Sequence, residues 1–65
     1  MTNLTEKDVD VLTQILTGEE IACKKARVYS KTLTDAALAM QMERVANEHA
    51  ARFQALYSIL NGGKA

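Results

Sequence analysis

The feature that most constrains this chain is a pair of apolar stripes with helical spacing, separated by a short break. The chain has no proline and only three glycines in 65 residues, so long helices can form without interruption. Apolar residues recur at steps of three and four on both sides of residues 32–35, and this spacing places them on one face of a helix. The sequence therefore predicts an all-α chain with two helices.

The sequence predicts one domain that consists of two helices joined by a turn. We expect helices over about residues 6–31 and 36–61, a turn over about 32–35 and a frayed tail over 62–65. The stripe of the first helix is Val9, Leu12, Leu16, Glu19, Cys23, Ala26, Ser30 and Leu33, and that of the second is Leu38, Met42, Val45, His49, Phe53, Leu56 and Leu60. Because the connection is short, the helices must be antiparallel neighbours.

Residues that favour helix ends stand at these boundaries. Thr5 and Asp8 have the spacing of a capping box, with Asp in the usual place of Glu. Thr34 or Asp35 can cap the second helix through a side-chain oxygen. The run over 61–63 ends this helix with Asn and Gly, which tolerate the left-handed conformation.

Gly18 lies inside the first predicted helix, at a cost of roughly 1 kcal/mol relative to alanine. One interpretation is that the helix tolerates this glycine as a defect. The other is that the glycine permits the close approach of another helix or a small kink near Glu19. The sequence leaves both interpretations open.

Two helices cannot enclose a core by themselves. A domain of this size is marginally stable unless something staples it, and Cys23 is the only cysteine, so no intramolecular disulfide can form. A monomer would leave a large apolar patch exposed to water. We therefore expect a homodimer, in which a two-fold axis joins two hairpins into a four-helix bundle.

Composition argues against several classes of function. The formal net charge is zero, whereas nucleic-acid binding usually needs a basic face. No apolar stretch approaches the roughly 20 residues that cross a bilayer and no signal peptide is evident, so we expect an intracellular protein without membrane contact, with Cys23 reduced. Cys23 and His49 lack an orienting group and oxyanion donors, so we predict no enzyme and no catalytic residue.

Glu19 and His49 are polar residues on the otherwise apolar faces of the two helices. In a hairpin that turns near residue 34, positions 19 and 49 are equally far from the turn, so both side chains lie level and point inward. They could hydrogen-bond to each other, or Glu19 could reach a Lys or Arg. A two-fold axis would bring two carboxylates and two imidazoles into one core, and these are ligand types found in metal sites. The pair is thus either a polar core or a metal site, working or vestigial.

Several short sequence runs between residues 4 and 62, taken together, resemble a known protein family. They are Leu4-Thr5-Glu6-Lys7-Asp8, Gly18-Glu19-Glu20, Lys24-Lys25 with Tyr29, Thr34-Asp35, and Asn47-Glu48-His49-Ala50-Ala51-Arg52-Phe53. In this combination the chain resembles the small Coat F proteins of spore-forming bacteria. The resemblance implies a ferritin-like bundle, a place in or near the spore coat with other coat proteins as partners, and no established reaction.

The Coat F group is similar to ferritin-like and rubrerythrin-like helical hairpins. In their metal-binding members a Glu of the first helix joins a Glu-x-x-His motif on the second. The resemblance assigns these roles to Glu19 and His49, but the Glu of the motif falls on Ala46. The leading expectation is therefore a non-catalytic structural or interaction protein without a cofactor. The alternative is an iron or zinc protein that uses Glu19 and His49 of both subunits, without the carboxylate that normally bridges the metal ions.

Overall fold

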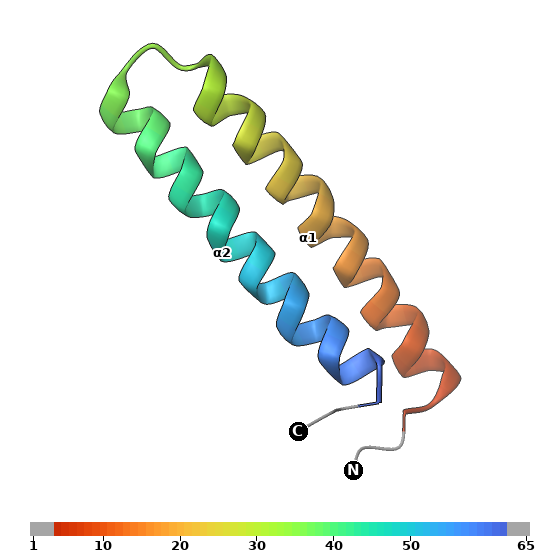
Figure 1. Ribbon diagram of the computed structural model, residues 1–65. Helices are drawn as coiled ribbons and strands as arrows, with labels where there is room; N and C mark the ends of the chain where they lie inside the picture. Colours follow the sequence, from red (N-terminus) through yellow and green to blue (C-terminus); the bar gives the residue numbers. More distant parts are fainter. Residues whose placement is uncertain (1–3, 63–65) are drawn as a thin grey trace.

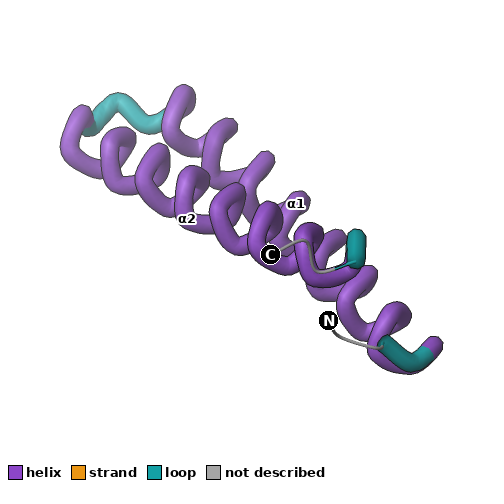
Figure 2. The backbone as a smooth tube through the Cα atoms, turned by 60° about the horizontal axis from the view of Figure 1, so that its bottom comes forward, coloured by secondary structure: helices purple, strands orange, loops and turns teal. Residues whose placement is uncertain are grey.

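The computed structural model describes residues 4–62, which form two helices in a hairpin (Figure 1). Helix α1 spans Glu6–Thr32 and helix α2 spans Ala36–Leu60. The helices lie side by side and antiparallel, with the connection at one end and the start of α1 and end of α2 at the other (Figure 2). The all-helical hairpin predicted from the sequence is confirmed for these residues, which contain no strand.

Side-chain caps fix the start of each helix. The hydroxyl of Thr5 accepts a hydrogen bond from the backbone N–H of Asp8 at 3.0 Å, and the carboxylate of Asp8 accepts one from the N–H of Thr5 at 3.2 Å. This is a complete capping box. At the start of α2 the cap is Asp35, whose carboxylate accepts from the N–H of Leu38 at 2.9 Å. Both caps satisfy N–H groups that have no partner within their own helix.

The end of α2 has the expected chemistry as far as the described residues reach. Gly62 has a φ of 101°, a left-handed conformation that glycine adopts without the steric cost of a Cβ atom. The N–H of Asn61 donates to the carbonyl of Tyr57 at 2.8 Å and closes the last turn. The rest of the tail expected to fray, residues 63–65, lies outside the described residues.

The core between the helices is small. Among residues 4–62 only Leu16, Ala26 and Ala46 are buried, and Ala46 has no exposed surface at all. The trace measures 46 × 21 × 10 Å, so the hairpin is a single layer of helices. Each helix therefore has a neighbour on one side only, and most residues of the predicted stripes are half-buried rather than buried.

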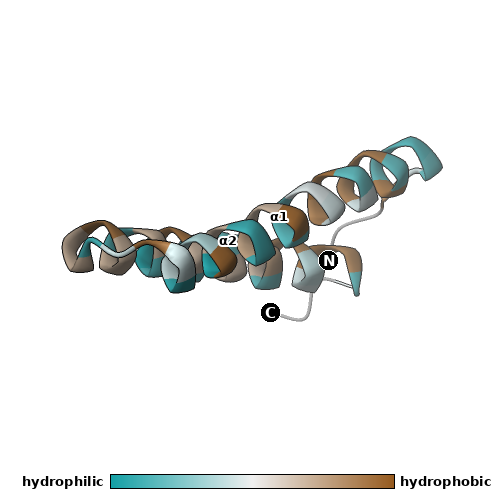
Figure 3. Ribbon diagram, turned by 90° about the horizontal axis from the view of Figure 1, so that it is seen from above, coloured by the Kyte–Doolittle hydropathy of each residue, from teal (hydrophilic) through white to brown (hydrophobic). Residues whose placement is uncertain are grey.

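Large apolar side chains remain exposed along both helices, and apolar segments recur over the whole length of the hairpin (Figure 3). In the described part of the chain these side chains are Val9, Val11, Ile15, Ile21, Val28, Tyr29, Leu33, Leu38, Met40, Tyr57 and Ile59. Three of them, Val9, Leu33 and Leu38, belong to the predicted stripes but lie near the ends of the hairpin, where one neighbouring helix covers them poorly. Neither helix has an apolar segment long enough to span a membrane.

The enclosure of Ala46 predicts a difference between two otherwise similar substitutions. Ala46→Leu adds atoms at a position with no exposed surface and should destabilise the hairpin by about 1–3 kcal/mol through overpacking. Ala51→Leu is the control, because Ala51 is exposed on the same helix and should change stability by less than about 0.5 kcal/mol. Urea unfolding followed by circular dichroism measures both values. Equal effects would show that Ala46 is not at a close helix contact.

Candidate functional site

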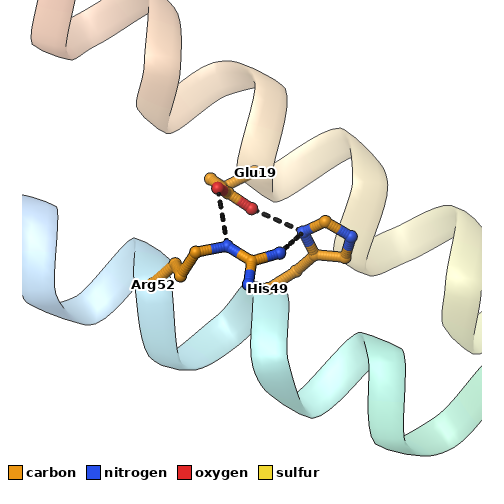
Figure 4. Close-up of polar contacts among 3 residues, drawn as sticks. All are labelled: Glu19, His49 and Arg52. Atoms are coloured by element: carbon orange, nitrogen blue, oxygen red, sulfur yellow. Dashed lines mark hydrogen bonds and ion pairs between the residues drawn. The ribbon is translucent and has the colours of Figure 1, made fainter.

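Glu19 of α1 and His49 of α2 face each other near the middle of the hairpin (Figure 4). Nδ1 of His49 lies 2.5 Å from Oε1 of Glu19. The side chain of Glu19 is 17% exposed and that of His49 is 22% exposed, so water reaches both only in part. The contact confirms the prediction that two positions equally distant from the turn lie level and point inward.

Arg52 joins this pair from the next turn of α2. Its Nε donates to Oε2 of Glu19 at 3.0 Å, so both carboxylate oxygens are engaged. The sequence left open whether Glu19 pairs with His49 or with a Lys or Arg, and the structure shows both interactions together. The spacing of three residues between His49 and Arg52 places them on one side of α2. This spacing is the one feature of the sequence that could have predicted Arg52 as a member of the site. An apolar pattern does not point to Arg52, because this residue lies beside the apolar stripe rather than on it.

The geometry assigns a proton to Nδ1 of His49. Nη2 of Arg52 lies 2.9 Å from this nitrogen, but a guanidinium can only donate. A hydrogen bond from Nη2 would need an unprotonated Nδ1, whose lone pair would then face the carboxylate of Glu19. With a proton on Nδ1, His49 donates to Glu19, and the contact with Nη2 is not a hydrogen bond. The ring atom left for any further partner is Nε2.

The hydrogen bond from His49 is the main reason that the pKa of Glu19 lies below its ordinary value of 4.5. Partial desolvation of the carboxylate opposes this effect, while the hydrogen bond and the charge of Arg52 add to it. Glu19 is therefore ionised at neutral pH. Its carboxylate accepts hydrogen bonds from His49 and Arg52 and so links α1 to α2.

The cluster of Glu19, His49 and Arg52 is a cross-helix polar clasp, and Arg52 works against a metal ion at the same place. Its guanidinium occupies one oxygen of Glu19 and brings a positive charge beside His49. Within residues 4–62 no group of three or more His, Cys, Asp or Glu side chains could hold a metal ion. Ala46, which stands where the resembling metalloproteins carry Glu, is enclosed between the helices. A metal site at Glu19 and His49 stays a prediction that requires ligands from elsewhere.

Cys23 lies apart from the clasp. It is a free, half-buried thiol in a shallow, mainly apolar cleft. The other residues that line the cleft are Glu20, Lys24, Ala50, Phe53 and Gln54. Within residues 4–62 no hydrogen bond joins Cys23 to His49, whose side-chain contacts are with Glu19 and Arg52, so the structure does not pair Cys23 with the imidazole as a nucleophile and base.

Comparisons with protein-family models, with curated proteins and with solved structures give no match to this chain. The similarity to Coat F proteins and ferritin-like hairpins stays an expectation that rests on the short runs in the sequence. Function must therefore be inferred from the clasp and from the surface of the hairpin.

The clasp predicts that Glu19→Ala and His49→Ala are coupled. Removing either side chain leaves the other part-buried without its partner, so the double substitution should cost less than the sum of the two single ones. Coupling between Glu19 and Arg52 should be weaker, because the Arg52 side chain is 53% exposed and solvent screens its charge. Two double-mutant cycles based on chemical unfolding measure both couplings. Strict additivity in the first cycle would contradict a stabilising contact between Glu19 and His49.

The lowered pKa of Glu19 also predicts a dependence of stability on pH. A carboxyl group whose pKa is lower in the folded than in the unfolded chain stabilises the fold above the unfolded pKa, and this contribution is lost as the pH falls through the folded pKa. The stability difference between wild type and Glu19→Gln should therefore be constant near neutral pH and shrink below about pH 4.5. Thermal unfolding of both proteins across this range tests the sign. A difference that grows on acidification would contradict it.

Proposed function

We propose that the protein is a non-catalytic structural or interaction protein that acts as a homodimer, with two hairpins packed into a ferritin-like four-helix bundle. The observation that carries this proposal is the imbalance, within the described part of the chain, between a core of three buried side chains and the many apolar side chains left exposed. A small chain that buries so little is marginally stable alone. Burial of that surface on a partner supplies the missing hydrophobic stabilisation.

One side of the hairpin carries a partly exposed row of residues, or seam, on each helix, which is apolar on α1 and which on α2 combines the stripe residues Leu38 and Val45 with Arg52 and Ile59. On α1 its residues follow one another at steps of four, three, four and seven, and on α2 they recur every seventh residue, all of them helical repeats. Val11 and Ile59 line one shallow cleft at the open end of the hairpin, which places both seams on the same side. This Val11 face comprises Val11, Ile15, Gly18, Ala22 and Tyr29 of α1 with Leu38, Val45, Arg52 and Ile59 of α2.

A second copy of the chain suits this face. The broad side of the hairpin measures 46 × 21 Å, which is large enough for the roughly 800 Å² that each partner buries in a standard interface. Steps of three and four are also the spacing with which helices pack at small angles in bundles. Two copies with zero net charge approach each other without long-range repulsion.

The resemblance to small Coat F proteins adds a place of action to the proposal, namely the spore coat. It also suggests other coat proteins as further partners, and both suggestions depend on the short runs in the sequence alone. A dimer formed through the Val11 face would leave the outward sides of both hairpins free for such contacts. Val28 and Met40, which are 59% and 62% exposed, lie there.

A glutamate placed in the Val11 face should break the dimer. Ile15→Glu puts a charge in the middle of the face, where Ile15 is 41% exposed in the single hairpin. It should raise the dimer Kd by more than about tenfold, the equivalent of about 1.4 kcal/mol, because the charge would have to be desolvated at the interface. Light scattering coupled to size-exclusion chromatography measures the association state at micromolar concentrations.

Val28→Glu is the matched control, since it makes a similar change on the outward side of α1. It should leave the dimer intact, and circular dichroism at the same micromolar concentrations should show that Val28→Glu keeps the helix content of the wild type. A wild-type protein that is monomeric and fully helical at micromolar concentration would refute the proposal. Equal weakening by Ile15→Glu and Val28→Glu would refute the assignment of the face.

A further inference from the structure

Symmetry leaves two ways to stack the Val11 face on a second copy of itself. If the two-fold axis runs along the helices, both turns lie at the same end and α1 packs on the partner's α2. If the axis crosses the helices, the turns lie at opposite ends, α1 packs on the α1 of the partner, and α2 packs on its α2. Both arrangements bury the same apolar residues, so the charged residues of the face must discriminate between them.

The seam of α2 carries two opposite charges at its centre. Between the four α2 residues of the Val11 face lie Gln41, Glu48 and Ala55, so that the whole seam reads Leu38, Gln41, Val45, Glu48, Arg52, Ala55 and Ile59, at steps of three and four. Glu48 is exposed and, within residues 4–62, makes no ion pair. Arg52 uses Nε for Glu19 and turns Nη2 toward His49, which leaves Nη1 without a contact in the cluster (Figure 4).

Glu48 and Arg52 complement the same two residues of a second hairpin only when the α2 helices of the two hairpins pack antiparallel. An axis that crosses α2 between Glu48 and Arg52 brings Glu48 of each hairpin against Arg52 of the other, which makes two equivalent ion pairs. With the axis along the helices, Arg52 would lie level with Ile15 of the partner, and Glu48 would lie between the partner's Gly18 and Ala22. Neither charge would then meet an opposite charge at its own level.

The same axis passes α1 beside Gly18. The contact between Glu19 and His49 shows that the centre of the α2 seam lies level with Gly18. A Cβ atom added at Gly18 would meet nothing within 4 Å, so this part of α1 is open to an approaching helix. Gly18 and Ala22 are the smallest residues of the Val11 face, and small residues allow two helix backbones to approach closely.

We infer that the two hairpins pack with their turns at opposite ends, on a two-fold axis beside Gly18 and the clasp, and that Glu48 of each hairpin pairs with Arg52 of the other. This inference rests on the proposed dimer and adds its arrangement. It also gives Arg52 two roles, because the same guanidinium holds Glu19 within its own chain and Glu48 across the interface. The partner that the Val11 face selects is a second copy in this one orientation.

Distance measurement between spin labels tests the arrangement. Cys23→Ser removes the native thiol and Thr34→Cys provides one labelling site in the turn, where Thr34 is exposed. Residue 34 lies 16 positions beyond Gly18, so two turns at opposite ends should be about 48 Å apart at a rise of about 1.5 Å per residue. Turns at the same end would be about 10 Å apart, the spacing of neighbouring helices. The short distance would overturn the inference while leaving the dimer intact, whereas the absence of any dipolar coupling would refute the dimer itself.

Charge reversal tests the ion pairs separately. Glu48→Lys should raise the dimer Kd on the order of tenfold, because it places two positive charges against each other at two equivalent sites. Glu43→Lys is the control, since Glu43 is exposed on α2 but lies off its seam. Both Kd values follow from sedimentation equilibrium, with helicity checked by circular dichroism. Equal Kd values for the two variants would overturn the pairing of Glu48 with Arg52.

Discussion

Burial of apolar surface is the constraint on which this structure depends, and one hairpin supplies too little of it. A single layer of two helices can cover only the stripe where they touch, and among residues 4–62 this contact buries Leu16, Ala26 and Ala46 alone. Helix formation over such lengths needs tertiary packing of an apolar face to be stable in water. The Val11 face, which the hairpin leaves partly exposed, is the surface that packing with another chain would use.

The clasp complements this apolar contact by selecting one alignment of the helices. Apolar stripes with regular spacing can slide past each other by a turn at modest cost, whereas an ionised Glu19 between His49 and Arg52 is satisfied at one level only. Polar groups in helix interfaces are best known for fixing register in this way. The clasp also lies level with the middle of the Val11 face. The alignment of α1 with α2 in one hairpin therefore determines which of its charged residues meet those of a second hairpin.

Much of the fold follows from local rules, which explains why it can be read from the sequence. Periodicity gives the two helices, a short polar break gives the turn, and the capping box of Thr5 and Asp8 forms as its spacing predicts. The level contact of Glu19 and His49 follows from counting residues on either side of the turn. These features need only neighbouring residues and the antiparallel direction of the helices.

Other features depend on side-chain geometry that spacing does not contain. Thr34 and Asp35 are both good caps in sequence, and only the path of the turn selects Asp35. The long side chain of Arg52 reaches Glu19 from beside the stripe, which an apolar pattern does not reveal. Leu33 and Leu38 are exposed because they lie at the end of the hairpin next to the turn. A residue there can face the neighbouring helix and still extend beyond the surface that this helix covers.

The dependence of thermal unfolding on protein concentration tests most directly the claim that folding and association are linked. If the hairpin is stabilised by a second copy, its unfolding midpoint should rise steadily as the concentration increases from low to high micromolar, because mass action favours the folded dimer. Circular dichroism melts of the wild-type protein over this range provide the measurement. A midpoint that does not change with concentration would show that the single hairpin is stable alone, and would contradict the account.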